Sequence, residues 1–212
     1  MRSLTEIANE CNTDKGTKTA AGHGFTDFYE QYIEKYKGKN PRILEIGIFH
    51  GESLNMWDKF FEGNCEIYGI DIEPKSSDKA NIHTIHMDQS LREHWQWFID
   101  NIGGEFDIII DDGSHIPEHQ AISLYYGTKL LKNGGIYILE DLHTNISPNP
   151  MNEYPLHALE YGDKMVGLTD EENKEVWDRI DRFAVFVRHN QKITDYYKER
   201  SITSVIKFKE RI

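Results

Sequence analysis

The chain has 212 residues, a hydrophobic content of 38% with 12% aromatic residues, and a formal net charge of −12. This length and composition are typical of a globular domain with a sizeable core, and they exclude a disordered or membrane-spanning chain. The acidic balance argues against nucleic acid or an anionic membrane as a partner. The two cysteines show no ligand-like spacing, and the first residues lack a signal-peptide core. We therefore expect a cytoplasmic protein with a single domain over residues 1–212.

Residues 1–40 are expected to form a helical N-terminal cap. Aromatic and aliphatic residues recur at helical spacing from Phe25 to Tyr36, and Gly38 ends the pattern. Beyond residue 40, short apolar runs alternate with helix-length segments. The expected strands cover 42–46, 66–70, 82–87, 106–110 and 135–139, and the expected helices cover 53–61, 91–100 and 117–131. This alternation predicts an α/β fold, a doubly wound and mostly parallel Rossmann-like sheet with right-handed crossovers.

The last third of the chain is less regular. Residues 145–167 contain three prolines and no clean period, which is typical of a long loop and predicts a lid over the strand ends. A helix is expected over residues 170–181. Two strands, over 183–187 and 204–209, are then expected to pair as an antiparallel hairpin at the sheet edge. They would complete a seven-stranded sheet.

The first strand, turn and helix carry a ligand-binding pattern. Glu45, Gly47 and Gly51 form E-x-G-x-x-x-G, in which glycine lets the backbone turn sharply close to a ligand. Phe49 stands where a dinucleotide-binding loop has its middle glycine, and no Walker A lysine follows, so a pyrophosphate is disfavoured. A cofactor with an adenosine but no phosphates fits better, which points to S-adenosylmethionine.

The next two strands end in polar residues that can complete this cofactor site. Asp71 is placed to accept hydrogen bonds from the ribose hydroxyls, and Asp88 and Gln89 are placed to meet the adenine edge. The alternative is that each aspartate only ends its strand, as aspartates often do. The occurrence of all these residues in the right order favours the cofactor site.

Two acidic segments, DDGSH at 111–115 and EDLHT at 140–144, each follow an apolar strand. Neighbouring parallel strands lie about 4.8 Å apart and end at the same edge of the sheet, where α/β proteins bind ligands. Carboxylates crowded at that edge repel one another unless a cation lies among them. The pattern therefore predicts a bound cation.

A divalent metal is the expected cation. Asp112, Glu140 and Asp141 offer the hard oxygen ligands that Mg²⁺ prefers, without a competing thiolate. Asp111 is expected to face the methionine end of the cofactor, because successive strand residues point to opposite sides. The alternative is that Asp112 and Asp141 merely cap the turns that follow them.

A histidine in the first acidic segment is the expected catalytic base. His115 follows Asp112 by three residues, and a neutral imidazole there can take the proton of a metal-bound hydroxyl. His143 in the second segment is the alternative base. The stretch HIPEH also matches an inverted zinc-peptidase pattern, but Pro117 fits the first turn of a helix and leaves His115 outside its register.

These motifs together resemble class I S-adenosylmethionine-dependent methyltransferases, and among them the metal-dependent macrolide-sugar O-methyltransferases of the mycinamicin and tylosin type. The resemblance covers residues 12–145 and rests on NTDKGT, LEIGIFHGESL, GIDIEP, DQS, FDIIIDDGSHIPEHQ and GGIYILEDLHT. It implies magnesium on Asp112 and the following Glu-Asp pair, with His115 as the base. It also implies that the D-K-G segment, which contains Lys15, lies near the cofactor.

The expected activity is Mg²⁺-dependent methyl transfer from S-adenosylmethionine to a hydroxyl of a sugar or glycosylated small molecule, in natural product or polysaccharide biosynthesis. A homo-oligomer is one of the expected states, although members of the family that act on glycosides often use a longer N-terminal region in oligomer contacts and this chain is short at that end. Two alternatives stay open. One is a metal-dependent hydroxylase or hydrolase on the same frame, and the other is a non-catalytic nucleoside-binding module.

Overall fold

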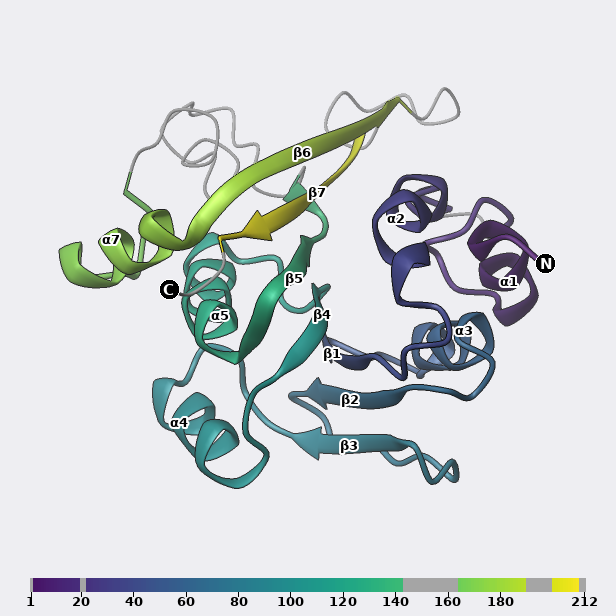
Figure 1. The fold of residues 1–212 in the computed structure, drawn as a ribbon, viewed down its shortest axis with the longest axis horizontal. Helices are drawn as coiled ribbons and strands as arrows, with labels where there is room; N and C mark the ends of the chain where they lie inside the picture. The colour runs from purple at the N-terminus through teal and green to yellow at the C-terminus, as the bar shows by residue number, and fades with distance from the viewer. Residues whose placement is uncertain (1, 20–21, 143–163, 190–199, 210–212) are drawn as a thin grey trace.

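The computed structural model describes residues 2–19, 22–142, 164–189 and 200–209. Within them, a seven-stranded sheet has the order β3-β2-β1-β4-β5-β7-β6 (Figure 1). Its parallel strands are β1 (Arg42–Ile46), β2 (Glu66–Asp71), β3 (Ile82–His86), β4 (Phe106–Asp111) and β5 (Leu131–Leu139). The strand β7 (Arg200–Phe208) runs antiparallel to both of its neighbours, β5 and β6 (Ile180–His189). The predicted mostly parallel sheet and its antiparallel edge hairpin are confirmed.

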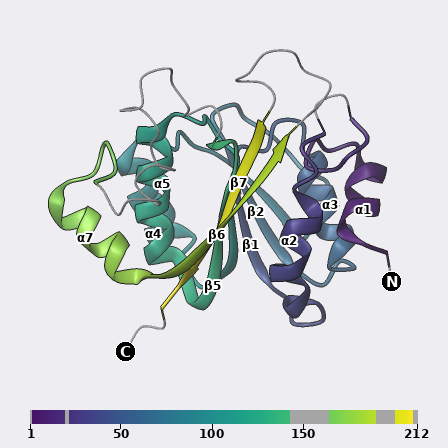
Figure 2. The same cartoon turned by 90° about the horizontal axis from the view of Figure 1, so that it is seen from above.

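Helices cover both faces of the sheet (Figure 2). One face carries α1 (Leu4–Cys11), α2 (Thr26–Ile33) with the short 3-10 turn η1 (Glu34–Tyr36), and α3 (Glu52–Phe60). The other face carries α4 (Arg92–Asn101), α5 (Pro117–Leu130) and α7 (Asp170–Arg179). Ser3 and Thr169 begin α1 and α7 with capping boxes, in which side chain and backbone satisfy each other's hydrogen bonds. The expected helical cap at the N-terminus is therefore present.

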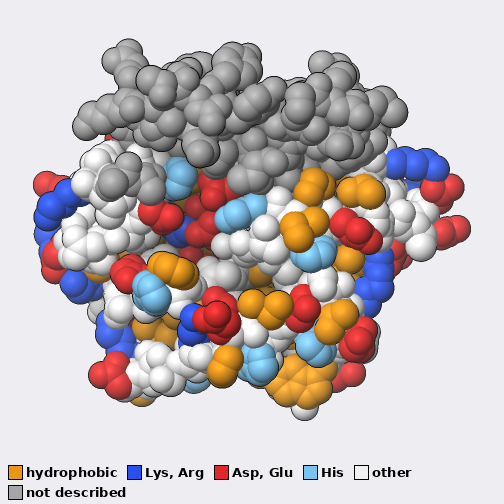
Figure 3. Space-filling view, turned by 180° about the vertical axis from the view of Figure 1, so that it is seen from behind, with side chains coloured by type: hydrophobic (Ala, Val, Ile, Leu, Met, Phe, Trp, Pro, Cys, Tyr) orange, Lys and Arg blue, Asp and Glu red, His pale blue; other side chains and the backbone are white. Residues whose placement is uncertain are grey.

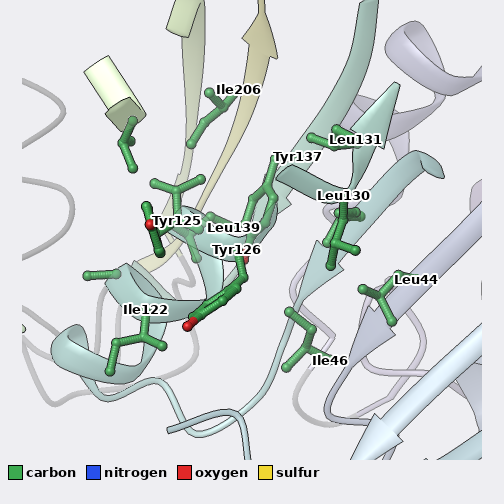
Figure 4. Packing of buried hydrophobic residues seen from close by; sticks show 14 of the residues in the cluster. Leu44, Ile46, Ile122, Tyr125, Tyr126, Leu130, Leu131, Tyr137, Leu139 and Ile206 are labelled. Atoms are coloured by element: carbon green, nitrogen blue, oxygen red, sulfur yellow. The ribbon is translucent and has the colours of Figure 1, made fainter. Parts of the chain in front are cut away.

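The helix α5 is fixed against the strand that leads to the second acidic segment. Tyr125 and Tyr126 of α5 lie among the same buried side chains as Tyr137 and Leu139 of β5 (Figure 4). Gly127 lies so close to the Tyr137 ring that a Cβ atom there would overlap it. This close packing places the helix that follows DDGSH directly against the strand that precedes EDLHT.

The N-terminal helices are joined to the same end of β5. Tyr29 of α2 is fully buried, and its hydroxyl lies 2.7 Å from Thr203 Oγ1 of β7. Thr203 Oγ1 in turn donates a hydrogen bond of 3.0 Å to the carbonyl oxygen of Leu139. The N-terminal cap and the last strands are thus both linked by hydrogen bonds to the end of β5, directly before Glu140.

The structure differs from the sequence expectations in a few bounds. β5 begins at Leu131, directly after α5, and its pairing with β4 shifts register between Phe106 and Ile108. β6 and β7 are longer than expected because their pairing continues from Ile180 to His189. Most of the expected lid, residues 145–163, lies outside the described residues. In the described part of the chain, no helix is long and apolar enough to cross a membrane.

Candidate functional site

The carboxyl ends of β1 and β4 mark a topological switch point of the sheet. The chain winds from β1 towards β2 and β3 on one side, and from β4 towards β5 on the other. Ligands bind at such points in α/β proteins. The backbone hydrogen bonds between neighbouring strands continue past the strand ends, because Asp112 N donates to Ile46 O and Glu140 N donates to Asp111 O, both at 2.9 Å. The two acidic segments therefore leave the sheet side by side, as expected.

Two adjoining cavities open at this edge. The larger, of about 640 Å³, is lined by the segment between α1 and α2, the β1–α3 turn and the two acidic segments. The smaller, of about 330 Å³, lies between the ends of β1, β2 and β3 and the start of α5. Gly47, Asp71 and Gly113 line both cavities. Figure 3 shows acidic and histidine side chains gathered around a hollow on the face opposite to that of Figure 1.

The two glycines of the β1–α3 turn serve different purposes. Gly47 has φ +79°, and a Cβ atom there would overlap the backbone of Asp112 and Gly113. Gly51 has φ +86°, but a Cβ atom there would meet nothing within 4 Å. Gly51 is therefore needed only for its backbone conformation. Gly47 also lets the turn pass close to the first acidic segment, a requirement that the ligand-binding pattern alone did not reveal.

A pair of alanine substitutions separates these two requirements. Gly51→Ala is expected to lower the free energy of unfolding by about 1 kcal/mol, the cost of a side chain at positive φ. Gly47→Ala adds an overlap with backbone atoms and is expected to cost at least about 3 kcal/mol. Urea unfolding of both variants measures the difference. Equal losses would show that the close approach of the two turns is unimportant.

Asp71 at the end of β2 organises the same turn. Its Oδ2 accepts hydrogen bonds from the backbone N–H groups of Ile48 (3.0 Å) and Phe49 (3.1 Å), and its Oδ1 accepts one from Glu73 (2.9 Å). Asp71 also lines both cavities, and Asp88 lines the smaller one. Both aspartates thus lie where the sequence predicted them, although their contacts with a ribose or an adenine stay predictions.

Gln89 lines the smaller cavity and also belongs to a buried polar network. Its Nε2 donates to Asp111 Oδ1 (3.2 Å) and Ser123 Oγ (3.0 Å), and its Oε1 accepts from Ser114 N (2.7 Å). Asp111 Oδ2 accepts a hydrogen bond of 3.0 Å from the Tyr137 hydroxyl. Burial raises the pKa of Asp111 to about 6. The structure places the Asp111 carboxylate behind the wall rather than on it, since Asp111 lines neither cavity.

Lys15 lies in the segment between α1 and α2, and its ammonium group lies among the carboxylates at the strand ends. Its side chain is 1% exposed, and its Nζ donates to Asp112 Oδ2 and to Glu140 Oε2, the latter at 3.0 Å. Glu45 Oε1 lies 3.8 Å from the same Nζ. Burial alone lowers the pKa of a lysine, but the charges of these carboxylates raise the pKa of Lys15 well above its usual value. The surrounding carboxylates therefore favour the charged form of Lys15.

We call Glu45, Asp112, Glu140 and Asp141 the acidic cluster. Burial raises the pKa of Glu45 to about 7, although Lys15 opposes the shift and Trp57 Nε1 donates a hydrogen bond of 3.0 Å to the carboxylate. Burial and the charge of Asp112 raise the pKa of Glu140 well above its usual value. The single ammonium group of Lys15 thus does not balance the negative charge that the four carboxylates of the acidic cluster can carry. Glu45 lines neither cavity, so it is placed behind the wall, like Asp111.

Three side chains converge at the larger cavity in a way that suits a metal ion. Asp112, His115 and Asp141 each offer a ligand atom, and these atoms lie within 4.8 Å of one another. His115 Nε2 lies 3.3 Å from Asp141 Oδ2 and 4.0 Å from Asp112 Oδ1. His115 and Asp141 both have positive φ, 56° and 53°, which is uncommon outside glycine and typical of functional sites.

Glu140, the third predicted metal ligand, stands beside this group with one oxygen available. Its Oε2 is held by Lys15, while its Oε1 is buried and has no hydrogen-bond partner among the described residues. Carboxylate oxygens of this kind fit a hard divalent cation such as Mg²⁺. Asp112 and Asp141 are thus brought together with the predicted base, while Glu140, which lines neither cavity, is linked to Asp112 through Lys15. The alternative base, His143, lies outside the described residues.

The sequence analysis missed the part that Lys15 plays in this arrangement. The D-K-G segment was expected near the cofactor, and Lys15 does line the larger cavity. However, the described contacts of its ammonium group are all with carboxylates. No local pattern indicates this, because the partners lie about 30 to 125 residues further along the chain. Contact of Lys15 with a cofactor stays a prediction.

The sequence is similar to those of known O-methyltransferases. The mycinamicin VI 2''-O-methyltransferase of Micromonospora griseorubida is 39% identical over 137 residues, which cover 59% of this chain and 33% of the relative. The demethylmacrocin O-methyltransferase of Streptomyces fradiae is 39% identical over 138 residues, with the same coverage. The chain spans about a third of the length of these curated relatives. No protein-family model matches it.

The fold is similar to that of solved methyltransferase structures. MycE, a methyltransferase of mycinamycin biosynthesis in complex with Mg and SAH, matches with a TM-score of 0.75 and 29% identity, over 99% of this chain and 55% of MycE. MycE in complex with Mg, SAH and mycinamycin VI matches with a TM-score of 0.73 and 28% identity, with the same coverage. These relatives confirm the Rossmann-like methyltransferase fold and the resemblance to sugar O-methyltransferases that the motifs predicted.

Proposed function

We propose that this chain carries an S-adenosylmethionine-dependent, Mg²⁺-dependent O-methyltransferase activity towards a hydroxyl of a sugar or glycosylated small molecule. The convergence of Asp112, His115 and Asp141 beside two adjoining cavities at the switch point carries this proposal. The names of the curated relatives and the Mg and SAH in the similar structures support it. The chain covers only part of those proteins, so the activity of the whole protein is part of the proposal.

The smaller cavity is the proposed place of the adenosine end of the cofactor. There Asp71 would accept hydrogen bonds from the ribose hydroxyls and Asp88 would meet the adenine edge. Gly47 and Gly51 shape the turn that joins the two cavities. Gln89, which lines the same cavity, would meet the adenine edge together with Asp88. Glu45 and Asp111 would support the wall from behind, through the hydrogen bonds described above. Lys15 would then lie at the larger cavity, beside the acceptor.

Asp112, Glu140 and Asp141 would hold Mg²⁺, which when bound lowers the pKa of a coordinated hydroxyl. His115, beside these carboxylates, would accept the proton of the acceptor hydroxyl. S-adenosylmethionine, when bound, would supply the methyl group to the acceptor oxygen, and the sulfonium sulfur would keep the electron pair of the broken bond and leave as a neutral thioether. The cavity walls hold the two reactants close together, which lowers the entropic part of the barrier.

The remaining expectations belong to the same proposal. We propose a single domain over residues 1–212, in the cytoplasm, with residues 145–167 as a lid over the acceptor. A homo-oligomer is also part of this proposal. The acidic lining of the larger cavity favours an uncharged hydroxyl acceptor over nucleic acid, because the carboxylates of the acidic cluster repel phosphate groups.

Chelation tests this function directly. Calorimetry is expected to show that the apo protein binds S-adenosylhomocysteine, and a panel of glycosides and catechols should reveal turnover of S-adenosylmethionine. Turnover should vanish in EDTA and return with Mg²⁺, because the carboxylates need the metal to bind the acceptor oxygen. Purified protein that contains iron or zinc would favour a hydroxylase or hydrolase instead. Binding of the nucleoside without turnover of any acceptor would favour a non-catalytic module.

A further inference from the structure

The acidic cluster already contains a cation of the chain itself. We infer that Lys15 is a built-in counter-ion, which keeps the acidic cluster assembled without metal and whose positive charge, held on Asp112 and Glu140, weakens the binding of a divalent cation beside it. This inference rests on the proposed function, since it presupposes a divalent cation at the cluster. It gives Lys15 a positioning role that differs from the cofactor contact implied by the family resemblance.

The lysine and a metal ion would use different oxygens of the same carboxylates. Lys15 Nζ binds Oδ2 of Asp112 and Oε2 of Glu140. Asp112 Oδ1 lies instead on the side of His115, at 4.0 Å from Nε2, and Glu140 Oε1 has no hydrogen-bond partner among the described residues. The ammonium therefore fixes one oxygen of each carboxylate and leaves the other oxygen for a second cation.

The backbone around Lys15 holds the ammonium in place. Lys15 O accepts hydrogen bonds from Phe25 N (3.0 Å) and Thr26 N (3.3 Å), at the start of α2. Lys15 N donates to Thr13 Oγ1 at 3.4 Å. With its side chain 1% exposed, Lys15 cannot swing into water without disturbing this segment. A metal ion at the cluster would thus have to bind beside the lysine.

Two positive charges that share buried carboxylates repel each other strongly, because the effective dielectric constant there is far below that of water. Lys15 should therefore lower the affinity for Mg²⁺. In the absence of the metal, the same charge offsets the repulsion among the buried carboxylates. The wild-type site should consequently be formed before Mg²⁺ binds, and Mg²⁺ should be held loosely.

Lys15→Met tests this inference, with Lys18→Met as the matched control. Lys18 lies in the same segment but is exposed. For Lys15→Met, calorimetry is expected to show at least about tenfold tighter Mg²⁺ binding, because a nearby like charge is removed. Its melting temperature in EDTA should fall by several degrees, and Mg²⁺ should raise it far more than in the wild type. Lys18→Met should match the wild type in both measurements.

The other outcomes are equally informative. Equal or weaker Mg²⁺ binding by Lys15→Met would overturn the inference, and would mean that the lysine mainly orients the metal ligands. A loss of S-adenosylhomocysteine affinity with unchanged Mg²⁺ binding would overturn it in favour of a cofactor contact. If the wild type binds no Mg²⁺ at all, the proposed function fails together with the inference, whereas a failure of the inference alone leaves wild-type Mg²⁺ binding intact.

A second variant covers the case in which Lys15→Met does not fold. Lys15→Gln keeps a hydrogen-bond donor near Asp112 and Glu140 and removes only the charge. It is also expected to bind Mg²⁺ more tightly than the wild type does. Folding of either variant only in the presence of Mg²⁺ would support the inference, because the metal would then replace the missing counter-ion. Binding no tighter than that of the wild type would overturn it.

Discussion

Asp112→Ala is expected to lower the rate of methyl transfer by roughly a thousandfold, about 4 kcal/mol in activation free energy, because the metal would lose a central ligand. Among the described carboxylates, Asp112 alone lies both beside His115 and Asp141 and in contact with Lys15. Its removal therefore affects the proposed metal ligands and the position of the acceptor together. Turnover of S-adenosylmethionine with an identified acceptor, measured across Mg²⁺ concentrations, provides the test.

A loss of activity in Asp112→Ala should not reflect unfolding. Burial raises the pKa of Asp112, and the charge of Asp141 raises it further, so removal of the carboxylate relieves repulsion in the cluster. Lys15 keeps Glu140 and Glu45 as partners. The melting temperature should thus stay close to that of the wild type. Asp78→Ala, which removes an exposed carboxylate far along the chain, serves as the control and should retain full activity.

Asp112→Asn separates the charge of the residue from its shape. The amide keeps one oxygen in place but binds a divalent cation far more weakly than a carboxylate does. An intermediate loss of activity that high Mg²⁺ partly restores is expected. Full activity of Asp112→Ala at every Mg²⁺ concentration would eliminate the metal role of this residue, and with it the proposed mechanism.

The fold was largely predictable from periodicity. The apolar runs at Arg42–Ile46 and Phe106–Ile110 are short, rich in isoleucine and followed by glycine or aspartate, so local patterns suffice to indicate buried strands. The observed β1 and β4 match them within one residue. The early start of β5 at Leu131 was not predictable, because the residues up to Gly135 carry no strand pattern and join the sheet through pairing with β4.

The acidic edge of the site was predictable for a topological reason. Parallel strands joined by one helix end at the same edge, so DDGSH and EDLHT had to meet once β4 and β5 were neighbours. What the sequence could not indicate was which carboxylates face a cavity and which are buried behind it. Asp111 and Glu45 are buried by partners such as Tyr137 and Trp57, whose positions depend on the packing of whole helices.

The charge balance of the site shows the same limit of sequence reasoning. The acidic segments alone predict a missing cation, and a metal ion was the expected answer. The structure adds Lys15, which comes from a segment outside the sheet and supplies part of that charge. Burial still raises the pKa of Glu140 and Glu45 in its presence, so Lys15 offsets the desolvation of these carboxylates only in part. The two cations would therefore bind different oxygens of the same carboxylates, and their like charges would oppose each other.

His115→Ala is expected to lower kcat by about a hundredfold to ten-thousandfold, the usual contribution of a positioned general base. The imidazole lies beside the proposed metal ligands, with Nε2 at 3.3 Å from Asp141 Oδ2. The binding of Mg²⁺ and of S-adenosylhomocysteine should be nearly unchanged in the variant.

The same geometry also allows His115 to act as a metal ligand. The affinity of the His115→Ala variant for Mg²⁺ distinguishes this role from that of a general base. Since a ring nitrogen of His115 lies within 4.8 Å of the ligand atoms of Asp112 and Asp141, the imidazole can itself reach a metal ion. If His115 is a metal ligand, its removal would weaken Mg²⁺ binding, and excess Mg²⁺ would restore the rate. His83→Ala, at a half-exposed position on the edge strand β3, provides a histidine control. An unchanged kcat in His115→Ala would assign the proton transfer to another group, with His143 as the next variant to measure.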